Sequence, residues 1–201
     1  MLWQFADPLV LASKSQVRRA MLEAAGLPVV VAPADIDERG IEMRAGPAGP
    51  SEVAQLLARE KARVASARTG ARFVVGADQT LAVGERQFSK PIDRVSAREQ
   101  LRALSGRTHE LHSAVAVARD GRVLFCQADV ARLTMRSLSD RFLETYLDAA
   151  GQAVTESVGA YQLEKLGIHL FERIDGDHFT ILGLPLFALL AFLRREGWLA
   201  G

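Results

Sequence analysis

Short apolar runs alternate with amphipathic stretches along the first half of the chain. The runs at residues 9–12, 29–32 and 73–77 are bounded by polar or turn-forming residues, as buried strands are. Between them the pattern predicts two helices. The first has Ser15 as its N-cap and ends at Gly26, and the second occupies residues 51–67. Strands that alternate with helices predict an α/β fold.

A hairpin interrupts this alternation in the second half. Two long β-type runs between residues 108 and 136 flank Asp120-Gly121, a strong turn signal. We also expect strands at residues 81–83 and 168–174, and helices at 96–104, 139–148 and 186–195. A hairpin among alternating elements predicts a mixed sheet. Residues 39–50 resemble a linker and end in Gly-Pro-Ala-Gly-Pro, so we expect a loop there, either a mobile lid or an inert connection.

Composition narrows the class of protein. The 201 residues include 25 Lys and Arg against 24 Asp and Glu, so the net charge does not favour nucleic acid or a membrane surface as a partner. The single cysteine, Cys126, excludes an internal disulfide, and we expect it to be a buried apolar residue. The longest apolar run, residues 181–193, is too short to cross a bilayer, and the first eight residues lack the basic charge of a secretory signal. We therefore expect a cytoplasmic protein.

A candidate anion site lies between the first strand and the first helix. Residues 13–19 read Ser-Lys-Ser-Gln-Val-Arg-Arg, and a helix that starts there offers free N–H groups, two hydroxyls and a guanidinium to a phosphate. The alternative is a solvated helix cap with surface arginines. Both the glycine fingerprint of dinucleotide sites and the Walker lysine loop are missing from the sequence.

Two acidic positions follow strands and form a candidate metal site. Asp78 ends the third strand, and Glu38 closes an acidic tetrad after the second. Carboxylate oxygens without nearby histidines suit Mg²⁺ or Mn²⁺ better than zinc, although strand-end acids are common in α/β proteins. Lys61 and Lys90 belong to only four lysines in the chain, and each either neutralises phosphate charge or is a solvated surface residue.

The histidines and serines give weaker signals. His109 and His112 lie three apart on a predicted strand, so they face opposite sides and cannot share a metal. No sequence motif pairs Cys126 or a serine with a histidine and an acid for acyl transfer.

Taken together, these stretches resemble the Maf family of nucleoside triphosphate pyrophosphatases. The resemblance is ordered and covers nearly the whole chain. It rests on residues 11–19 (Leu-Ala-Ser-Lys-Ser-Gln-Val-Arg-Arg), 35–38 (Asp-Ile-Asp-Glu), 59–62 (Arg-Glu-Lys-Ala), 75–79 (Val-Gly-Ala-Asp-Gln), 89–91 (Ser-Lys-Pro), 104–109 (Leu-Ser-Gly-Arg-Thr-His), 159–161 (Gly-Ala-Tyr) and 183–186 (Gly-Leu-Pro-Leu). Gln16 stands where the family commonly has a proline, which makes the backbone of the anion site less rigid.

The resemblance implies a fold, a reaction and a set of site residues. It implies one Maf-like domain over residues 1–201, elongated and two-lobed with a central cleft like inosine triphosphatases, and usually a homodimer. The implied reaction hydrolyses a nucleoside triphosphate to its monophosphate and pyrophosphate with a divalent cation. Asp78 matches the catalytic acid and, with Glu38, the metal site. The positions matching the triphosphate site are Ser13, Arg18, Lys61 and Lys90.

Base choice depends on three further positions of the resemblance, which match Val17, Gln79 and Glu164. The pyrimidine-cleaving branch typically has Arg, Thr and Gln there, and the branch acting on 7-methylguanosine triphosphate has Trp, Gln and Glu. A carboxylate at Glu164 accepts from the N1–H and N2–H₂ donors of guanine and suits uracil or thymine less well. Val17 cannot stack on a cationic methylated base as Trp would. We therefore expect a guanine-type substrate without requiring the methyl group.

Two alternatives remain open. One is a pyrophosphatase for pyrimidine nucleotides such as dTTP or UTP. The other belongs to a different class, a nucleotide-binding regulator of cell division without turnover. The complete set of Asp78, Glu38, Lys61 and Lys90 favours an enzyme, because a protein that only binds nucleotides does not need a positioned acid.

Overall fold

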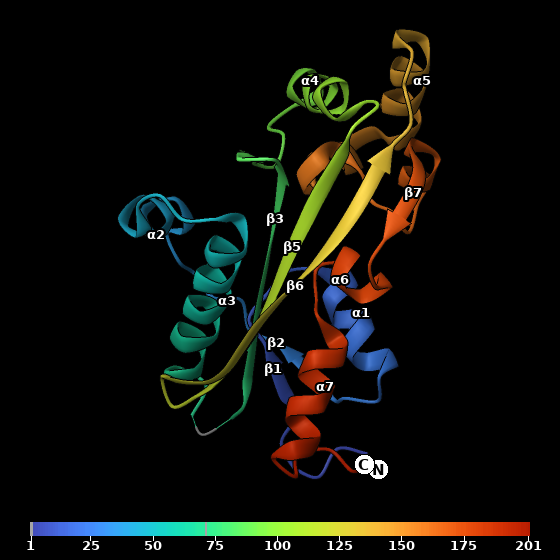
Figure 1. Ribbon diagram of the computed structural model, residues 1–201. Helices are drawn as coiled ribbons and strands as arrows, with labels where there is room; N and C mark the ends of the chain where they lie inside the picture. Colours follow the sequence, from blue (N-terminus) through green and yellow to red (C-terminus); the bar gives the residue numbers. More distant parts are fainter. Residues whose placement is uncertain (1, 71) are drawn as a thin grey trace.

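The computed structural model describes residues 2–70 and 72–201 and contains a mixed seven-stranded sheet with helices on both faces (Figure 1). The strand order is β2-β1-β3-β5-β6-β7, and β4 pairs with β3. The strands are β1 (Leu9–Leu11), β2 (Val29–Val31), β3 (Val74–Val83), β4 (Arg86–Phe88), β5 (Thr108–Arg119), β6 (Arg122–Met135) and β7 (Phe171–Asp175). The α-helices are α1 (Gln16–Ala24), α2 (Glu38–Ala45), α3 (Pro50–Ser66), α4 (Arg94–Leu104), α5 (Asp140–Ala150), α6 (His178–Ile181) and α7 (Leu186–Arg195).

Strand β3 is open along part of one edge. On its other edge β5 pairs with it antiparallel from Val74 to Ala82. Strands β1 and β4 therefore share the remaining edge of β3. The pairing with β1 extends only to Val75 of β3, and the pairing with β4 begins at Leu81 of β3. Residues 76–80 of β3 lie between these two pairings and have no strand partner on this edge within the described chain. The loop that follows β1 therefore begins beside this gap.

Helix α3 packs unusually close to the sheet, because small residues form both surfaces. The contact is made by Ala54, Ala58 and Ala62 of the helix and by Ala114, Ala116 and Ala118 of β5. At Gly76 of β3 the two backbones lie so close that an added Cβ would be 2.2 Å from the carbonyl oxygen of Ala58. A glycine inside a strand often marks such a close backbone approach, and here it fixes the distance between α3 and β3.

Two core clusters occupy opposite ends of the long strands. The first joins β1, α1 and α7 to the start of β3, and the second joins the end of β3 to α4 and α5. Representative members are Leu9, Leu11, Val75 and Phe192 in the first, and Leu81, Leu101, Leu133 and Leu147 in the second. Strands β3, β5 and β6 pass through both ends (Figure 1).

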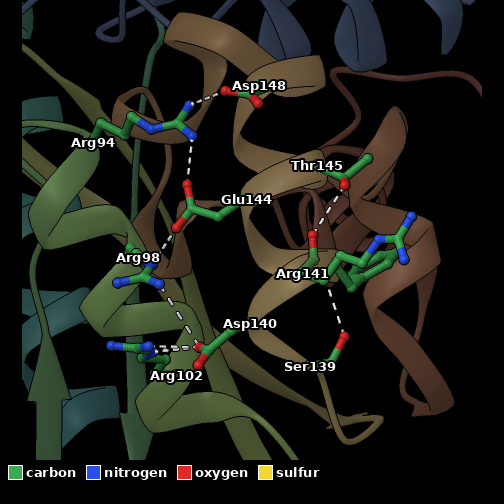
Figure 2. Close-up of polar contacts among 10 residues, drawn as sticks. Arg94, Arg98, Arg102, Ser139, Asp140, Arg141, Glu144, Thr145 and Asp148 are labelled. Carbon is green, nitrogen blue, oxygen red and sulfur yellow. Dashed lines mark hydrogen bonds and ion pairs between the residues drawn. The ribbon is translucent and has the colours of Figure 1, made fainter.

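Helices α4 and α5 are also joined by a ladder of ion pairs (Figure 2). Arg98 Nε lies 2.5 Å from Glu144 Oε1, and Arg94 lies 2.8 Å from both Glu144 and Asp148. These side chains are a third or more exposed, so each pair contributes only about 0.2–1 kcal/mol. The ladder aligns two helices that the second core cluster already holds.

The predicted α/β class with a mixed sheet is confirmed, and three local expectations need correction. Residues 39–45 belong to helix α2 rather than to a loop, because the Asp37 side chain accepts a hydrogen bond from the Gly40 N–H and caps a new helix. The strands expected at 73–77 and 81–83 form one strand, β3. Residues 168–170 lie in a 3₁₀ turn, and the strand starts only at Phe171.

The expectation that Cys126 is a buried residue also needs correction. Cys126 is only partly buried, on β6, where it packs against the alanine surface of α3. The described residues contain no helix that is long and apolar enough to span a bilayer. Met1 of the expected 1–201 domain lies outside the described residues, as does residue 71.

Candidate functional site

Lys61 joins two carboxylates at the open edge of β3. Its Nζ lies 2.5 Å from Asp78 Oδ1 and 2.8 Å from Glu38 Oε1. Lys61 and Asp78 each expose only 12% of their side chains, whereas Glu38 is half exposed. Three residues predicted from separate parts of the sequence therefore converge on one point.

The local structure explains this convergence. Asp78 follows Gly76 by two residues, so both lie on the face of β3 that packs against α3. The close approach at Gly76 brings Lys61 of α3 within reach of Asp78. Helix α2 starts at Glu38, which places this carboxylate at the helix end that faces Lys61.

Burial and charge act in opposite directions on the central acid. Burial raises the pKa of Asp78, and the positive charges of Lys61 and Arg18 oppose that rise. Burial likewise lowers the pKa of Arg18, against the charges of Asp78 and Glu38. The site is thus a partly desolvated cluster of opposite charges, in which interactions are stronger than in water.

Arg18 connects the loop after β1 to this cluster. Its Nη1 donates to the Ala77 carbonyl at 2.9 Å and to Ser13 Oγ at 3.4 Å, and its Nε donates to the Gly183 carbonyl at 2.8 Å. Gly183 has a φ of 92°, and a Cβ there would lie 3.1 Å from the guanidinium. The guanidinium therefore joins three segments around the gap in β3, through two backbone carbonyls and the Ser13 hydroxyl.

The predicted anion site at the start of α1 adjoins this cluster. Ser15 caps α1 by accepting from the Arg18 N–H at 3.3 Å, and its own N–H donates to Ser13 Oγ at 3.2 Å. Through Arg18 these hydroxyls lie next to the end of β1 and the middle of β3. The structure thus brings Ser13 and Arg18 together with Asp78, Glu38 and Lys61.

Lys90 does not take part in the contact that Lys61 makes with the two carboxylates. Strand β4 ends at Phe88, which pairs with Leu81, and Lys90 follows two residues later. Its side chain is exposed. Among the residues that the structure describes, it forms no ion pair with Asp78 or Glu38. The direction of β4 still carries the chain toward the open edge of β3.

A pocket of about 530 Å³ lies between α1, α6 and α7, and it is mostly apolar. Val17 and Glu164, two of the expected base-selecting residues, line it. Gln79 takes a different position: its Nε2 donates to Ser113 Oγ and to the carbonyls of Thr180 and Ile181, at 2.9–3.2 Å. Gln79 therefore holds α6, which forms one wall of the pocket, in place.

Sequence reasoning missed two groups near the site. Glu42 lies one turn after Glu38 in α2, and burial, followed by the charges of Asp78 and Glu38, raises its pKa. The spacing of four would have shown this shared face had residues 39–45 been recognised as helix.

The second missed group is a serine, a histidine and an acid that no motif had suggested. Ser51 Oγ lies 2.7 Å from His112 Nδ1, and His112 Nε2 lies 3.1 Å from Glu110 Oε2. Burial lowers the pKa of His112, and the charge of Glu110 opposes this. Ser51 is in the first turn of α3, so the contact fastens that helix to β5, across from Thr80.

The side chains at this site could supply only part of the coordination shell of a metal ion. No group of three or more His, Cys, Asp or Glu side chains forms a metal cluster within residues 2–70 and 72–201. However, the oxygens of Asp78 and Glu38 already converge on one cation, the Lys61 ammonium. Two carboxylates are typical of Mg²⁺ sites in which substrate phosphates and water complete the shell, so the residues present fit such an ion.

Comparisons with known proteins extend over almost the whole chain. A family model described as Maf-like protein matches residues 8–196. A nucleoside triphosphate pyrophosphatase of Bradyrhizobium diazoefficiens is 59% identical over 199 residues, which cover 99% of this chain and 98% of the relative. A 7-methyl-GTP pyrophosphatase of Brucella abortus is 50% identical over 195 residues, 96% of this chain and 98% of that one. Among solved structures, a HAM1 protein from Coxiella burnetii is 21% identical and aligns with a TM-score of 0.44 over 63% of this chain and 72% of its own.

Proposed function

This chain belongs to the Maf-like family and is a nucleoside triphosphate pyrophosphatase, and we propose that Asp78, Glu38 and Lys61 form its catalytic centre. The observation that carries the proposal is the convergence of Asp78 Oδ1 and Glu38 Oε1 on Lys61 Nζ at 2.5 and 2.8 Å. A triphosphate brings about four negative charges. The buried Lys61, together with Arg18, is positioned to balance them.

In the proposed reaction, water attacks the α-phosphorus and the bond to the α–β bridging oxygen breaks, so that pyrophosphate leaves. Asp78 accepts the proton of the attacking water. Lys61 keeps this carboxylate ionised, while burial raises its pKa toward the working pH, as a general base requires. Lys90 neutralises the leaving pyrophosphate when the substrate bridges the open edge of β3.

Glu38 and Asp78 would hold a divalent cation, Mg²⁺ or Mn²⁺, with Glu42 one helical turn from Glu38. When bound, such a cation supplies Lewis-acid polarisation of the phosphate oxygens. Ser13 and the start of α1 contribute hydrogen-bond donors to the phosphates, while Arg18 fixes the loop that carries them.

For the base, the proposal is a guanine-type ring in the pocket lined by Val17 and Glu164. The exposed carboxylate of Glu164 offers only acceptors, which match the donors on the guanine edge. The amide nitrogen of Gln79 is already engaged with α6, so Gln79 influences base choice by shaping the pocket. The identity to a 7-methyl-GTP pyrophosphatase supports a methylated guanine within this class.

The proposal also covers organisation and assembly. The extent of the family match supports a single Maf-like domain with the substrate cleft between the two core clusters. The resemblance to the family supports a homodimer in the cytoplasm, and light scattering of the purified protein tests the dimer.

The test is pyrophosphate release with Mg²⁺ or Mn²⁺ from GTP, 7-methyl-GTP, UTP and dTTP, with Asp78→Asn as the matched variant. We expect guanine nucleotides to have the highest kcat/KM, and Asp78→Asn to lose turnover while it still binds nucleotide. A preference for UTP or dTTP would contradict the base assignment. Full activity of Asp78→Asn would remove this acid from the reaction. Binding without any release by the wild type would indicate a regulator.

A further inference from the structure

An exposed aromatic ring faces the pocket that adjoins the proposed catalytic centre. Phe187, on the first turn of α7, exposes 64% of its surface, whereas its neighbours Leu186 and Leu189 are buried in the first core cluster. Phe187 lines the pocket together with Phe179 of α6. A large apolar side chain left in solvent at a concave apolar site is typical of a ligand-binding surface.

The two rings are held in a fixed arrangement. The centroids of Phe179 and Phe187 lie 5.3 Å apart, and the planes are inclined by 82°. An edge-to-face contact is a favourable geometry for an aromatic pair. It uses the edge of one ring and one face of the other, so at least one face of Phe187 is not covered by Phe179, in keeping with the 64% exposure of Phe187. The backbone N–H of Phe179 donates to the Asp177 carboxylate at 2.9 Å, and the Phe179 side chain packs against the first core cluster, so backbone and ring are both held.

The pocket is connected to the proposed triphosphate site through two elements of the fold. Val17 lines it, and the next residue, Arg18, donates to the Ala77 carbonyl beside Asp78. On the other side, Gln79 binds the carbonyls of Thr180 and Ile181 at the end of α6, the helix that carries Phe179. Helices α1 and α6 thus each contribute to the pocket and also contact β3 next to Asp78.

We propose that Phe187, oriented by Phe179, is the stacking surface for the substrate base and a determinant of base specificity. The inference deepens the proposed function and rests on it. Val17 offers no aromatic face at the first turn of α1, and Phe187 supplies that face from α7 instead. Glu164, on the rim of the same pocket, then reads the edge of the stacked base. A ring that bears a positive charge, as 7-methylguanine does, gains a further cation–π attraction on Phe187.

The test compares Phe187→Ala with Phe187→Trp, which keeps an aromatic face, and with Leu124→Ala, which removes a 40% exposed side chain from β6 outside the pocket. The readouts are KM for GTP and 7-methyl-GTP, and the inhibition constant of inorganic tripolyphosphate, which has no base. We expect Phe187→Ala to raise KM about tenfold, the usual size of one base stack, and to change the tripolyphosphate constant by less than about twofold. Leu124→Ala should stay near the wild type, and Phe187→Trp, which restores an aromatic face, should have a KM well below that of Phe187→Ala.

Three results would overturn the inference: an unchanged KM in Phe187→Ala, an equal loss of tripolyphosphate inhibition, or conversion of a dimer to a monomer with loss of activity, which would assign Phe187 to a subunit interface. Direct titration with GTP applies the same comparison if the wild type has no turnover. The wild-type preference between GTP and UTP tests the proposed function separately, because stacking on Phe187 can fail while guanine remains the preferred base.

Discussion

Replacing Lys61 by methionine removes the cation between two carboxylates and leaves the apolar stem in place. Asp78 then keeps a desolvated negative charge whose nearest partner, at 2.5 Å, is gone. Removing one member of a buried ion pair typically costs about 3–5 kcal/mol, because the other charge remains buried. The half-exposed Glu38 adds less than about 1 kcal/mol, since water can replace its partner. We expect Lys61→Met to lower the free energy of unfolding by about 3–5 kcal/mol at pH 8, and to abolish turnover.

The pH dependence of this variant identifies the cause. Burial already raises the pKa of Asp78, and Lys61 is the largest opposing influence, so its loss raises that pKa further. The folded variant then binds a proton that the unfolded chain releases. Its stability must therefore increase as the pH falls from 8 toward 5, whereas the double variant Lys61→Met with Asp78→Asn should lack this increase.

Urea unfolding at pH 8, 7, 6 and 5 measures the effect, with Lys165→Met as the control at an exposed lysine. The change should appear in the midpoint at a constant slope, and in thermal unfolding as a loss of about 10 °C. A loss below about 1 kcal/mol that is independent of pH would contradict this prediction, because the Asp78 charge would then be solvated rather than buried.

Gly76→Ala should cost about 1–3 kcal/mol and lower kcat, because its Cβ would lie 2.2 Å from a backbone oxygen of α3 and would push Lys61 away; an unchanged kcat and urea midpoint would contradict this. Burial lowers the pKa of His109 to about 4, so the folded state resists protonation of this side chain. As the pH falls from about 6.5 to about 4, up to about 3 kcal/mol of the free energy of unfolding should be lost. In urea titrations His109→Gln should remove this part of the acid sensitivity. Arg98→Ala should cost less than about 1 kcal/mol, less still in 1 M salt, with kcat/KM unchanged; a larger loss would mean that the ladder of Figure 2 is more than a surface network.

The sequence predicted the central acid and its partners because each has a local signature. Asp78 ends an apolar run, Glu38 closes an acidic segment, and Lys61 is a rare lysine inside a matching motif. The distances among them depend on Gly76, whose lack of a side chain allows α3 to approach β3. The periodicity of the chain does not indicate which helix packs against that glycine. The contact of Lys61 with both Asp78 and Glu38 could therefore be seen only in the structure.

The errors have equally physical causes. Helix α2 was not recognised because residues 39–50 contain two prolines and several glycines, which usually mark loops. Of these only Gly40 lies inside α2, whose start is capped by Asp37; Gly46 ends the helix as its C-cap, and Pro50 begins α3. The contact of Ser51 with His112 joins residues 61 positions apart and leaves no periodic signal. Cap chemistry is local and readable, whereas pairing between distant elements depends on the assembled sheet.

The continuity of β3, β5 and β6 through both core clusters has a mechanical consequence. In many enzymes two halves swing about a flexible joint, and the hinge consists of a few loop residues. Here nine residue pairs join β3 to β5, and twelve join β5 to β6. A rotation of one half of the molecule against the other would therefore have to bend these three hydrogen-bonded strands. We therefore expect conformational changes on substrate binding to occur in elements outside these three strands, such as α2 and the segment after β4. The Asp78 carboxylate, on β3, should keep a nearly fixed position.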